Sequence, residues 1–350
     1  MKRAALLLGS LLMVGAMAQA EDTVVATPLV DQQVTAFKPT GYVDLQYRIY
    51  GKTENAENGT NDWNAGKNKT SRLQLQGSIA MTPNQSLEYR VREYNSLTSE
   101  PLGENAKKNE TRLRYFYKHG NLGDTKVSLI SRVQYYNKEG KDSQSLQYMP
   151  RFSFKSYMPA NVTKFVVAPF YEYEWNNSNN NTYDNKLGVN LETYTQLPYN
   201  FGFEFEVDTT QNFYGKDQLF DNGKNKKDHN FDVNIKAILS RDIVLYVQDK
   251  TDVKLHFEGG LDTYDMSQYR KYGEFTEKIN GKKTYYKGID KAQYVAYAEP
   301  SIQLGYSLND STVLYAAIGA KYKNWDNKAD TSASTWRWQP EAWAGFKTSF

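Results

Sequence analysis

The chain has 350 residues, among them 28 Tyr, 16 Phe and no Cys, and its formal net charge is +3. The lack of Cys excludes disulfides and thiolate metal sites, and the near-balanced charge gives no argument for nucleic-acid binding. Charged residues make up 24% of the chain beside the many aromatic ones. This composition suits a membrane barrel, whose aromatic girdles face lipid while a wet lumen tolerates charge.

Residues 1–20 have the features of a secretory signal peptide. A basic start precedes an apolar run from Ala4 to Val14, and residues 18–20 form a small-x-small cleavage site. An uncleaved anchor is the weaker alternative, because the run is short and interrupted. We expect the mature chain to begin at Glu21, and residues 21–39 to form a periplasmic N-terminal segment.

After residue 20, no apolar run approaches the roughly 20 residues that a spanning helix needs. Any membrane insertion must therefore use strands, and the strands must close into a barrel so that every backbone group is paired.

Alternation of apolar and polar residues with a period of two begins at Gly41. In residues 41–51 (GYVDLQYRIYG), for example, Asp44, Gln46 and Arg48 share one face and apolar residues fill the other. Long polar connections are expected near 52–69, 97–110, 138–145, 176–185, 214–228, 267–291 and 326–334. Shorter ones are expected near 83–86, 119–124, 158–162, 198–200 and 307–311, and residues 240–252 form a connection that is long for its side.

This pattern predicts an all-β fold, in which residues 40–350 form a transmembrane antiparallel β-barrel of about 14 strands with long external loops and short periplasmic turns. The count is uncertain by about two strands, because IVLYVQ at 243–248 is either an interfacial element or half of another hairpin. A soluble β-sandwich shows the same period, so the strand count, the loop asymmetry and the chain end decide between the two folds.

Proline and tryptophan add two local expectations. Four prolines fall inside strand patterns with outward parity, where each removes a ladder hydrogen bond, and we expect bulges at Pro150, Pro169, Pro300 and Pro340. Three tryptophans lie at the predicted external boundary, where an aromatic girdle belongs: Trp175, Trp325 and Trp336. The alternative for the tryptophans is ordinary aromatic usage in a Tyr-rich chain.

The last stretch, residues 335–350 (TWRWQPEAWAGFKTSF), carries the strongest signal. Counted back in twos from Phe350, one face is apolar and aromatic, and the other carries most of the charge. Alternation that runs into a terminal aromatic residue fits a membrane-barrel strand, because the ends of soluble chains usually fray into polar residues. A terminal Phe is also the feature by which the outer-membrane assembly machinery recognises its clients, so we predict that Phe350 is an assembly signal.

Several stretches together resemble the FomA family, the major outer-membrane porins of fusobacteria. The resembling segments are GYVDLQYRIYG (41–51), RLQ (72–74), TRLRYFYKHGNLGDTKV (111–127), EGGLDTYDMSQYRKYG (258–273), EPSIQLGYS (299–307) and the last stretch. They are distributed over nearly the whole mature chain, whereas the region before Gly41 departs from the longer Pro-rich or charged stretch of the family. The resemblance implies a trimeric, voltage-sensitive general diffusion porin.

Charged residues predicted to line the lumen are sorted along the chain. The basic ones come from the first five strands: Arg48, Arg72, Arg90, Arg92, Arg112, Arg114 and Arg132. The acidic ones come from strands seven to eleven: Glu172, Glu174, Glu192, Glu204, Glu206 and Glu258. Closure would place the two arcs on facing walls, whose transverse field orients dipolar solutes. The alternative is pairing between neighbouring strands in a filled interior, which is difficult for adjacent arginines that have only Glu88 nearby.

The sequence therefore predicts a porin, integral in the outer membrane of a Gram-negative bacterium, that passes small hydrophilic solutes and ions without a cofactor. About 14 strands lie between the roughly 8 that side chains fill and the roughly 16–18 of water-filled porins, so we expect a narrow channel. The two long loops at 214–228 and 267–291 are candidates to fold in and constrict it. The expected partners are outer-membrane lipid, the barrel-assembly machinery and further copies of the chain in a homotrimer.

Two other function classes were weighed. An adhesin or binding anchor that works through its external loops is the serious alternative. An enzyme is not expected, because only His119, His229 and His256 are present and no Ser nucleophile lies in the predicted strand that carries His256. No grouping of His with acids predicts a metal site.

Overall fold

The computed structural model describes residues 37–55, 68–98, 109–139, 143–176, 182–279, 282–326 and 334–350. The predicted signal peptide, and the predicted N-terminal segment apart from residues 37–39, lie outside the described residues.

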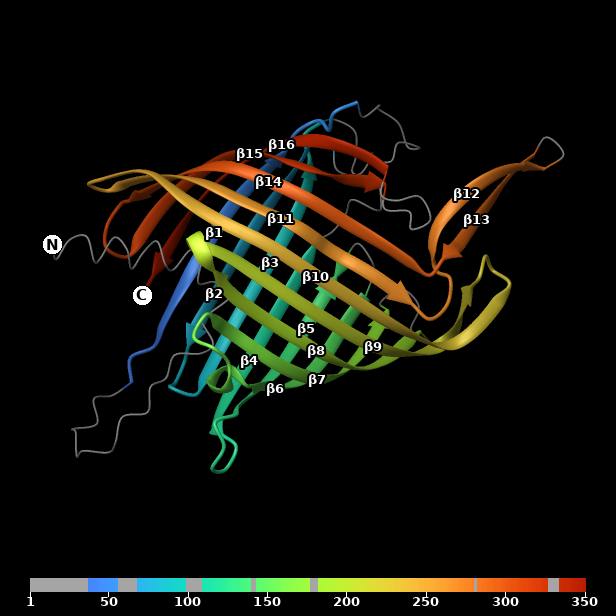
Figure 1. The fold of residues 1–350 in the computed structure, drawn as a ribbon, viewed down its shortest axis with the longest axis horizontal. Helices are drawn as coiled ribbons and strands as arrows, with labels where there is room; N and C mark the ends of the chain where they lie inside the picture. The colour runs from blue at the N-terminus through green and yellow to red at the C-terminus, as the bar shows by residue number, and fades with distance from the viewer. Residues whose placement is uncertain are drawn as a thin grey trace.

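Fourteen antiparallel strands close into one barrel, which confirms the predicted fold class and strand number (Figure 1). The strands are β1 (Thr40–Tyr50), β2 (Thr70–Ala80), β3 (Gln85–Ser96), β4 (Glu110–Asn121), β5 (Ser128–Lys138), β6 (Ser143–Ser153), β7 (Val162–Asn176), β8 (Tyr183–Leu197), β9 (Phe201–Phe220), β10 (Asn225–Gln248), β11 (Thr251–Ser267), β14 (Ala292–Ser307), β15 (Thr312–Asp326) and β16 (Ser334–Ser349). Each pairs with its neighbours in chain order, except that β11 pairs with β14. The intervening β12 (Tyr272–Ile279) and β13 (Lys282–Asp290) form a separate two-stranded sheet.

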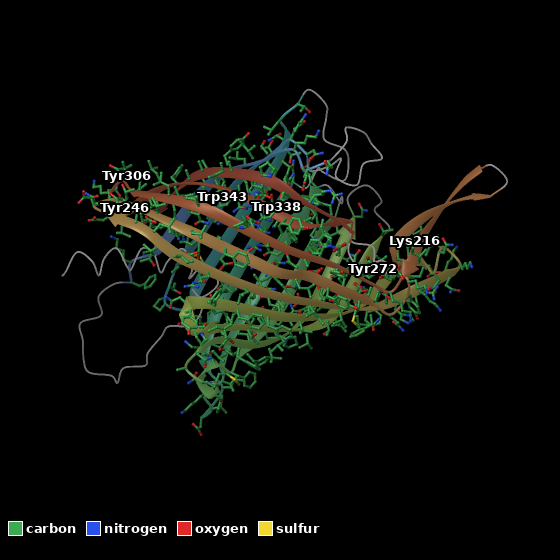
Figure 2. All side chains as sticks on the ribbon, turned by 45° about the horizontal axis from the view of Figure 1, so that its top comes forward. Lys216, Tyr246, Tyr272, Tyr306, Trp338 and Trp343 are labelled. Atoms are coloured by element: carbon green, nitrogen blue, oxygen red, sulfur yellow. The ribbon has the colours of Figure 1, made fainter. Side chains whose placement is uncertain are left out.

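The two ends of the barrel carry different connections, as the sequence predicted. The end with the start of β1 and the C-terminus, here called the turn end, has short connections such as 81–84, 249–250 and 308–311. The opposite end, the loop end, has the connections 51–69, 97–109 and 268–291. Figure 2 shows Tyr246 and Tyr306 at the turn end and Lys216 and Tyr272 at the loop end.

Two predicted connections are wrong, because the strands around them are longer than the alternation indicated. Residues 214–228 belong mostly to β9 and β10, which meet at a tight turn at 221–224. Residues 240–252 contain the end of β10 and a turn at 249–250, so IVLYVQ at 243–248 is strand. The side chains of 243–247 are 40–56% exposed on both strand faces. The alternation is lost there although the backbone still pairs with β11, which explains the error.

The predicted external connection 267–291 is present at the loop end, and most of it forms the β12–β13 hairpin, which the sequence analysis did not foresee. Figure 1 shows this hairpin projecting past the loop end of the barrel rather than into it. The predicted constriction of the pore by 267–291 or by 214–228 is therefore not formed.

A polar network fixes the base of this hairpin to the barrel. The Lys271 Nζ lies 2.6 Å from Oδ1 of Asp232, and the Asn212 Nδ2 donates to Oδ2 of the same carboxylate at 2.8 Å. Asn230 is fully buried beside them, donates to Asp232 and accepts from the Ser267 hydroxyl. Because every member is hydrogen bonded, the network holds the chain where it leaves β11.

The outward face of the barrel is apolar, and the inward face is polar and buried. Outward side chains in the middle of the strands are 37–50% exposed, for example Leu75, Leu113, Leu187 and Val189. Several inward side chains are at most 9% exposed, among them Gln74, Gln134 and Glu192. This arrangement is the inverse of a soluble barrel and is what a surrounding bilayer requires. The barrel therefore spans a membrane.

No helix within the described ranges is both long enough and apolar enough to cross a membrane.

The seam between β1 and β16 closes the sheet at the chain terminus. Gly41 and Phe350 exchange two backbone hydrogen bonds of 3.0 Å each, and Leu45 lies opposite Phe346. The predicted alternation of the last strand is confirmed, because Gln339 and Glu341 are 1% and 4% exposed whereas Trp338 is 42% exposed.

The predicted bulges at the strand prolines are wrong. Pro150 and Pro169 lie opposite each other in a stretch where β6 and β7 have no paired residues, and the register is the same on either side. The β14–β15 ladder has a similar gap at Pro300 without a shift, and Pro340 lies just beyond the last residue that β1 pairs. Proline has no N–H to donate, so a position in a gap of the ladder, or just past its last pair, accommodates it without a shift in register.

Aromatic rings gather at the loop ends of the strands, where the girdle is predicted. Trp336 and Trp338 lie 5.5 and 5.0 Å from the Tyr322 ring, and Trp175 stacks on Tyr173 at 5.7 Å. The Trp325 Nε1 donates to the carbonyl oxygen of Arg337 at 3.1 Å. These amphipathic rings suit the boundary between lipid and water.

Adjacent residues of β8 test which face meets lipid. Val189→Arg should lower the free energy of unfolding by about 2–4 kcal/mol, because the charge enters the bilayer. Asn190→Arg should have little effect, since it points at the carboxylates of Glu192 and Asp208 around the lumen cavity described below. Urea titration of each variant refolded in lipid vesicles measures the difference. Equal destabilisation by the two substitutions would contradict the assignment of faces.

Candidate functional site: the charged lumen

The predicted basic residues lie on the inner side of β1–β5. The register places Arg90 directly opposite Arg112, and Arg48 directly opposite Arg72. Six of them form one patch, called the basic wall: Arg72, Arg90, Arg92, Arg112, Arg114 and Arg132. Like charges on facing positions repel, so each guanidinium needs a partner or water.

Arg48 turns away from the basic wall toward two carboxylates on other strands. Its guanidinium forms ion pairs with Glu299 of β14 and Glu341 of β16, and it lies 4.4 Å from the centre of the Trp343 ring. Lys321 adds a second cation to Glu299 at 2.8 Å. These ion pairs link β1 to β14 and β16 across the inner side of the seam. Arg48 therefore belongs to this cluster and not to the basic wall.

Glu110 neutralises part of the basic wall, and sequence reasoning missed it. Its Oε1 lies 2.6 Å from Nη2 of Arg90 and 3.1 Å from Nη1 of Arg92. Residue 110 was assigned to the loop 97–110, whereas it is the first residue of β4. The preceding Asn109 hydrogen bonds to the backbone of β3, which is a contact that no period in the sequence signals.

Glutamine amides satisfy several guanidinium groups without cancelling their charge. Arg72 donates to Gln46 at 2.9 Å, Arg92 to Gln74 at 2.6 Å, Arg114 to Gln134 at 2.6 Å and Arg132 to Gln147 at 2.6 Å. A neutral acceptor fixes the side chain and replaces a water. These glutamines fix the guanidinium groups but add no negative charge to the basic wall.

Arg112 has no ion pair and no side-chain hydrogen bond with any described residue. The nearby carboxylate of Glu88 is 3.8 Å from Nη1 of Arg114, which is a loose contact between half-buried groups. The prediction that the adjacent arginines could not all be paired locally is thus confirmed at Arg112.

Lysines interrupt the predicted acidic arc. Lys186 bridges Glu172 at 3.0 Å and Glu174 at 2.7 Å. Lys236 pairs with Glu204 and lies 3.6 Å from Glu206. Both lysines share the inward parity of their partners, so a count of every inward charge would have found them. The expectation of an acidic arc that faces the basic one without compensation is wrong in these strands.

Glu192 is held by two cations. Arg151 of β6 donates to both its carboxylate oxygens, at 2.7 and 2.9 Å, and Lys164 of β7 lies at 2.6 Å. The Arg151 side chain is only 4% exposed. Arg151 and Glu192 therefore form a bidentate, largely buried ion pair, in which loss of one partner would leave a buried charge.

Asp208 of β9 faces inward without an ion pair or a side-chain hydrogen bond to any described residue. Its place in the alternation of residues 201–208 indicates the inward face, but no role was predicted for it. Glu258, by contrast, accepts a hydrogen bond of 2.5 Å from the Tyr297 hydroxyl.

A cavity of about 370 Å³ opens between the two sets of charges. Its basic lining is Arg112, Arg114, Arg132, Arg151 and Lys164. Its acidic lining is Glu88, Glu192, Glu206 and Asp208, and it is polar elsewhere, with Gln76 and Asn190 in the wall. The structure thus brings together five of the predicted pore-lining residues, Arg112, Arg114, Arg132, Glu192 and Glu206, with charged residues that were not predicted.

The inner face also holds an apolar cluster, which the sequence analysis did not foresee. Met149, Val166, Ala168 and Phe170 are 0–9% exposed on β6 and β7. Arg151 lies over this cluster, with its Nη1 3.9 Å from the Met149 Sδ. Part of the lumen is therefore filled by side chains, which narrows the interior on this side.

The histidines engage neighbouring polar groups. The His256 Nδ1 lies 2.5 Å from Oδ1 of Asp242, and Lys254 lies 2.6 Å from Oδ2 of the same carboxylate. His256 therefore pairs with Asp242 rather than with Glu258. No group of three or more His, Cys, Asp or Glu side chains that could hold a metal ion occurs in the described ranges.

Comparison with known proteins gives matches only among solved structures, because no family model and no curated protein matches the chain. A bacterial polysaccharide outer membrane secretin has 11% identity and a TM-score of 0.41, with 89% of this chain and 97% of that chain covered. The outer membrane channel DcaP of Acinetobacter baumannii has 9% identity and a TM-score of 0.38, with 89% and 96% covered. An anion-selective porin from Comamonas acidovorans has 10% identity and a TM-score of 0.34, with 89% and 99% covered. Similarities this distant do not bear on what the chain binds or transports.

The buried ion pair and the unpaired arginine should respond oppositely to the same substitution. Arg151→Met should lower the free energy of unfolding by about 3 kcal/mol, because it removes one partner of a buried pair. Arg112→Met should be neutral or stabilising, because it removes a charge that no described carboxylate compensates. Urea titration of both variants in vesicles measures the contrast, and a larger loss at Arg112 would contradict it.

Proposed function

We propose that this chain is an outer-membrane porin of a Gram-negative bacterium, which passes small hydrophilic solutes and ions passively through its lumen. The observation that carries the proposal is the polar cavity between charged walls inside a closed membrane barrel. A barrel that serves only as an anchor can fill its interior with apolar side chains. Here Arg112, which forms no ion pair with any described residue, is retained instead, at a cost in desolvation.

Small polar solutes are the permeants that such an interior suits. Fixed guanidinium and carboxylate groups replace part of a solute's hydration shell, while the apolar cluster at Met149 and the bulk of Arg151 restrict the width. No step in this passage needs a cofactor.

A homotrimer is proposed from the resemblance to the FomA porins alone. Recognition of Phe350 by the barrel-assembly machinery is proposed from the terminal Phe, the feature by which that machinery recognises its clients. The exposed Phe350 side chain, at 55%, is accessible for such recognition.

Capture of an external partner is the second candidate function, and one feature favours it. The β12–β13 hairpin stands clear of the barrel at the loop end. At the same end of the barrel, a cavity of about 420 Å³ at the ends of β7–β9 is lined in part by Trp175, Tyr183 and Lys216. Both roles are compatible with one barrel.

Conductance across a planar bilayer tests the porin function. The purified protein should give steps in multiples of three. In a KCl gradient, Arg112→Gln should shift the reversal potential toward cation preference, because a positive charge leaves the lumen. If the well-folded protein gave no conductance, the porin function would be excluded, and capture of an external partner would become the leading candidate.

Replacement of the last side chain tests the assembly signal. Phe350→Ala keeps the two backbone hydrogen bonds with Gly41, so refolding in detergent should proceed as in the wild type. The amount of folded protein in the outer membrane of cells should fall several-fold, as measured by heat-modifiable mobility on gels. Phe350→Tyr is the matched control and should assemble. If refolding in detergent failed to the same degree, the effect would be one of stability rather than recognition.

A further inference from the structure

We propose that the lumen cavity selects zwitterionic solutes, such as short peptides, by binding their carboxylate at Arg112 and their ammonium group at Asp208. The inference rests on the proposed porin function and specifies its substrate class. It is carried by two opposite charges that line one cavity and have no partner in the described part of the protein.

The positive pole of the cavity is Arg112. Every other arginine of its neighbourhood is engaged: Arg90 by Glu110, Arg114 by Glu88 and Gln134, and Arg151 by Glu192. The Arg112 guanidinium has planar donors free for a solute, and a carboxylate is the group that such a fork binds in bidentate fashion. A carboxylate that binds there also relieves the repulsion from Arg90, its register partner.

The negative pole is Asp208, with Glu206 beside it on the same face. Lys236 is the only cation that forms an ion pair with Glu206 among the described residues, at 3.6 Å, and it also pairs with Glu204. Asp208 has no such cation. An ammonium group that enters the cavity would therefore find a carboxylate that the protein leaves uncompensated.

The two poles belong to distant parts of the sheet. Arg112 is on β4 and Asp208 is on β9, and β5, β6, β7 and β8 lie between them in the barrel. They do not reach each other, so a solute that satisfies both must carry its two charges at separate ends. The volume of about 370 Å³ is far above the roughly 10–15 Å³ that one water needs, and it accommodates an organic solute of many atoms.

Fixed opposite charges discriminate among solute classes. An anion attracted to Arg112 is repelled by Asp208 and Glu206, and a cation meets the reverse. A neutral solute gains from neither pole, whereas a zwitterion gains at both. Partial hydration keeps each attraction weak enough for release, which is the condition for transport.

Osmotic swelling of vesicles that contain the purified full-length protein tests the proposal. The probes are triglycine and its N-acetylated amide, which share a backbone but differ in terminal charge. The wild type should admit triglycine faster by roughly threefold or more, a modest ratio because hydrated charges interact weakly. Arg112→Gln and Asp208→Asn should each bring the ratio close to one while KCl conductance persists.

Two control variants remove the same charges elsewhere. Arg337→Gln near the loop end and Asp252→Asn near the turn end do not line the cavity, and both should keep the preference. Equal rates for the two peptides in a conducting wild type would overturn the zwitterion site and leave the porin intact. A preference that survives both cavity variants would overturn the assignment to Arg112 and Asp208. If neither peptide nor KCl crossed the membrane, the porin function itself would fail, and the site with it.

Discussion

Backbone pairing without an edge is the constraint on which the rest of this structure depends. Lipid offers no partner for an open strand, so β1 must meet β16, and the reciprocal bonds between Gly41 and Phe350 complete that contact at the chain end. Closure then forces alternate side chains into a shared interior, where Arg48 can reach Glu299 and Glu341 although more than 250 residues separate Arg48 from either one. The charged lumen is a consequence of the closed sheet.

Most charged side chains in the described part of the lumen are paired with an opposite charge, and a few are not. Carboxylates and lysines neutralise most of the arginines and glutamates, glutamines satisfy geometry without neutralising, and a few groups are left over. If every charged side chain of the lumen had a partner of opposite charge, the interior would be more stable but would leave no charge free for a solute. Leaving Arg112 and Asp208 uncompensated sacrifices some stability for a field across the cavity.

The parts of the fold that could be predicted are those that depend on period and chain order. Strand number, the face of each residue and the difference between the two ends follow from alternation and connection length. The extended ends of β9 and β10 could not be predicted, because the side chains of residues 243–247 are exposed on both faces and no face pattern remains. The ion-pair partners of the lumen residues could not be predicted either. Glu110 belongs to β4 because it pairs with Arg92 of β3, and Lys236 pairs with Glu204 rather than with Asp208, although both carboxylates share one face of β9.

The unequal strand lengths give the barrel a wall of uneven height. β10 has 24 residues whereas β1 and β2 have 11 each. At roughly 3.4 Å per residue, β10 is about 80 Å long, whereas a tilted strand needs only about 9–11 residues to cross a bilayer. Much of β10 therefore lies outside the bilayer, divided between the two ends, because it extends past β9 at the turn end and past β11 at the loop end. The wall of each mouth is higher beside β10 than beside β1 and β2, so a solute that approaches along the membrane surface reaches the lumen more directly from the side of the short strands.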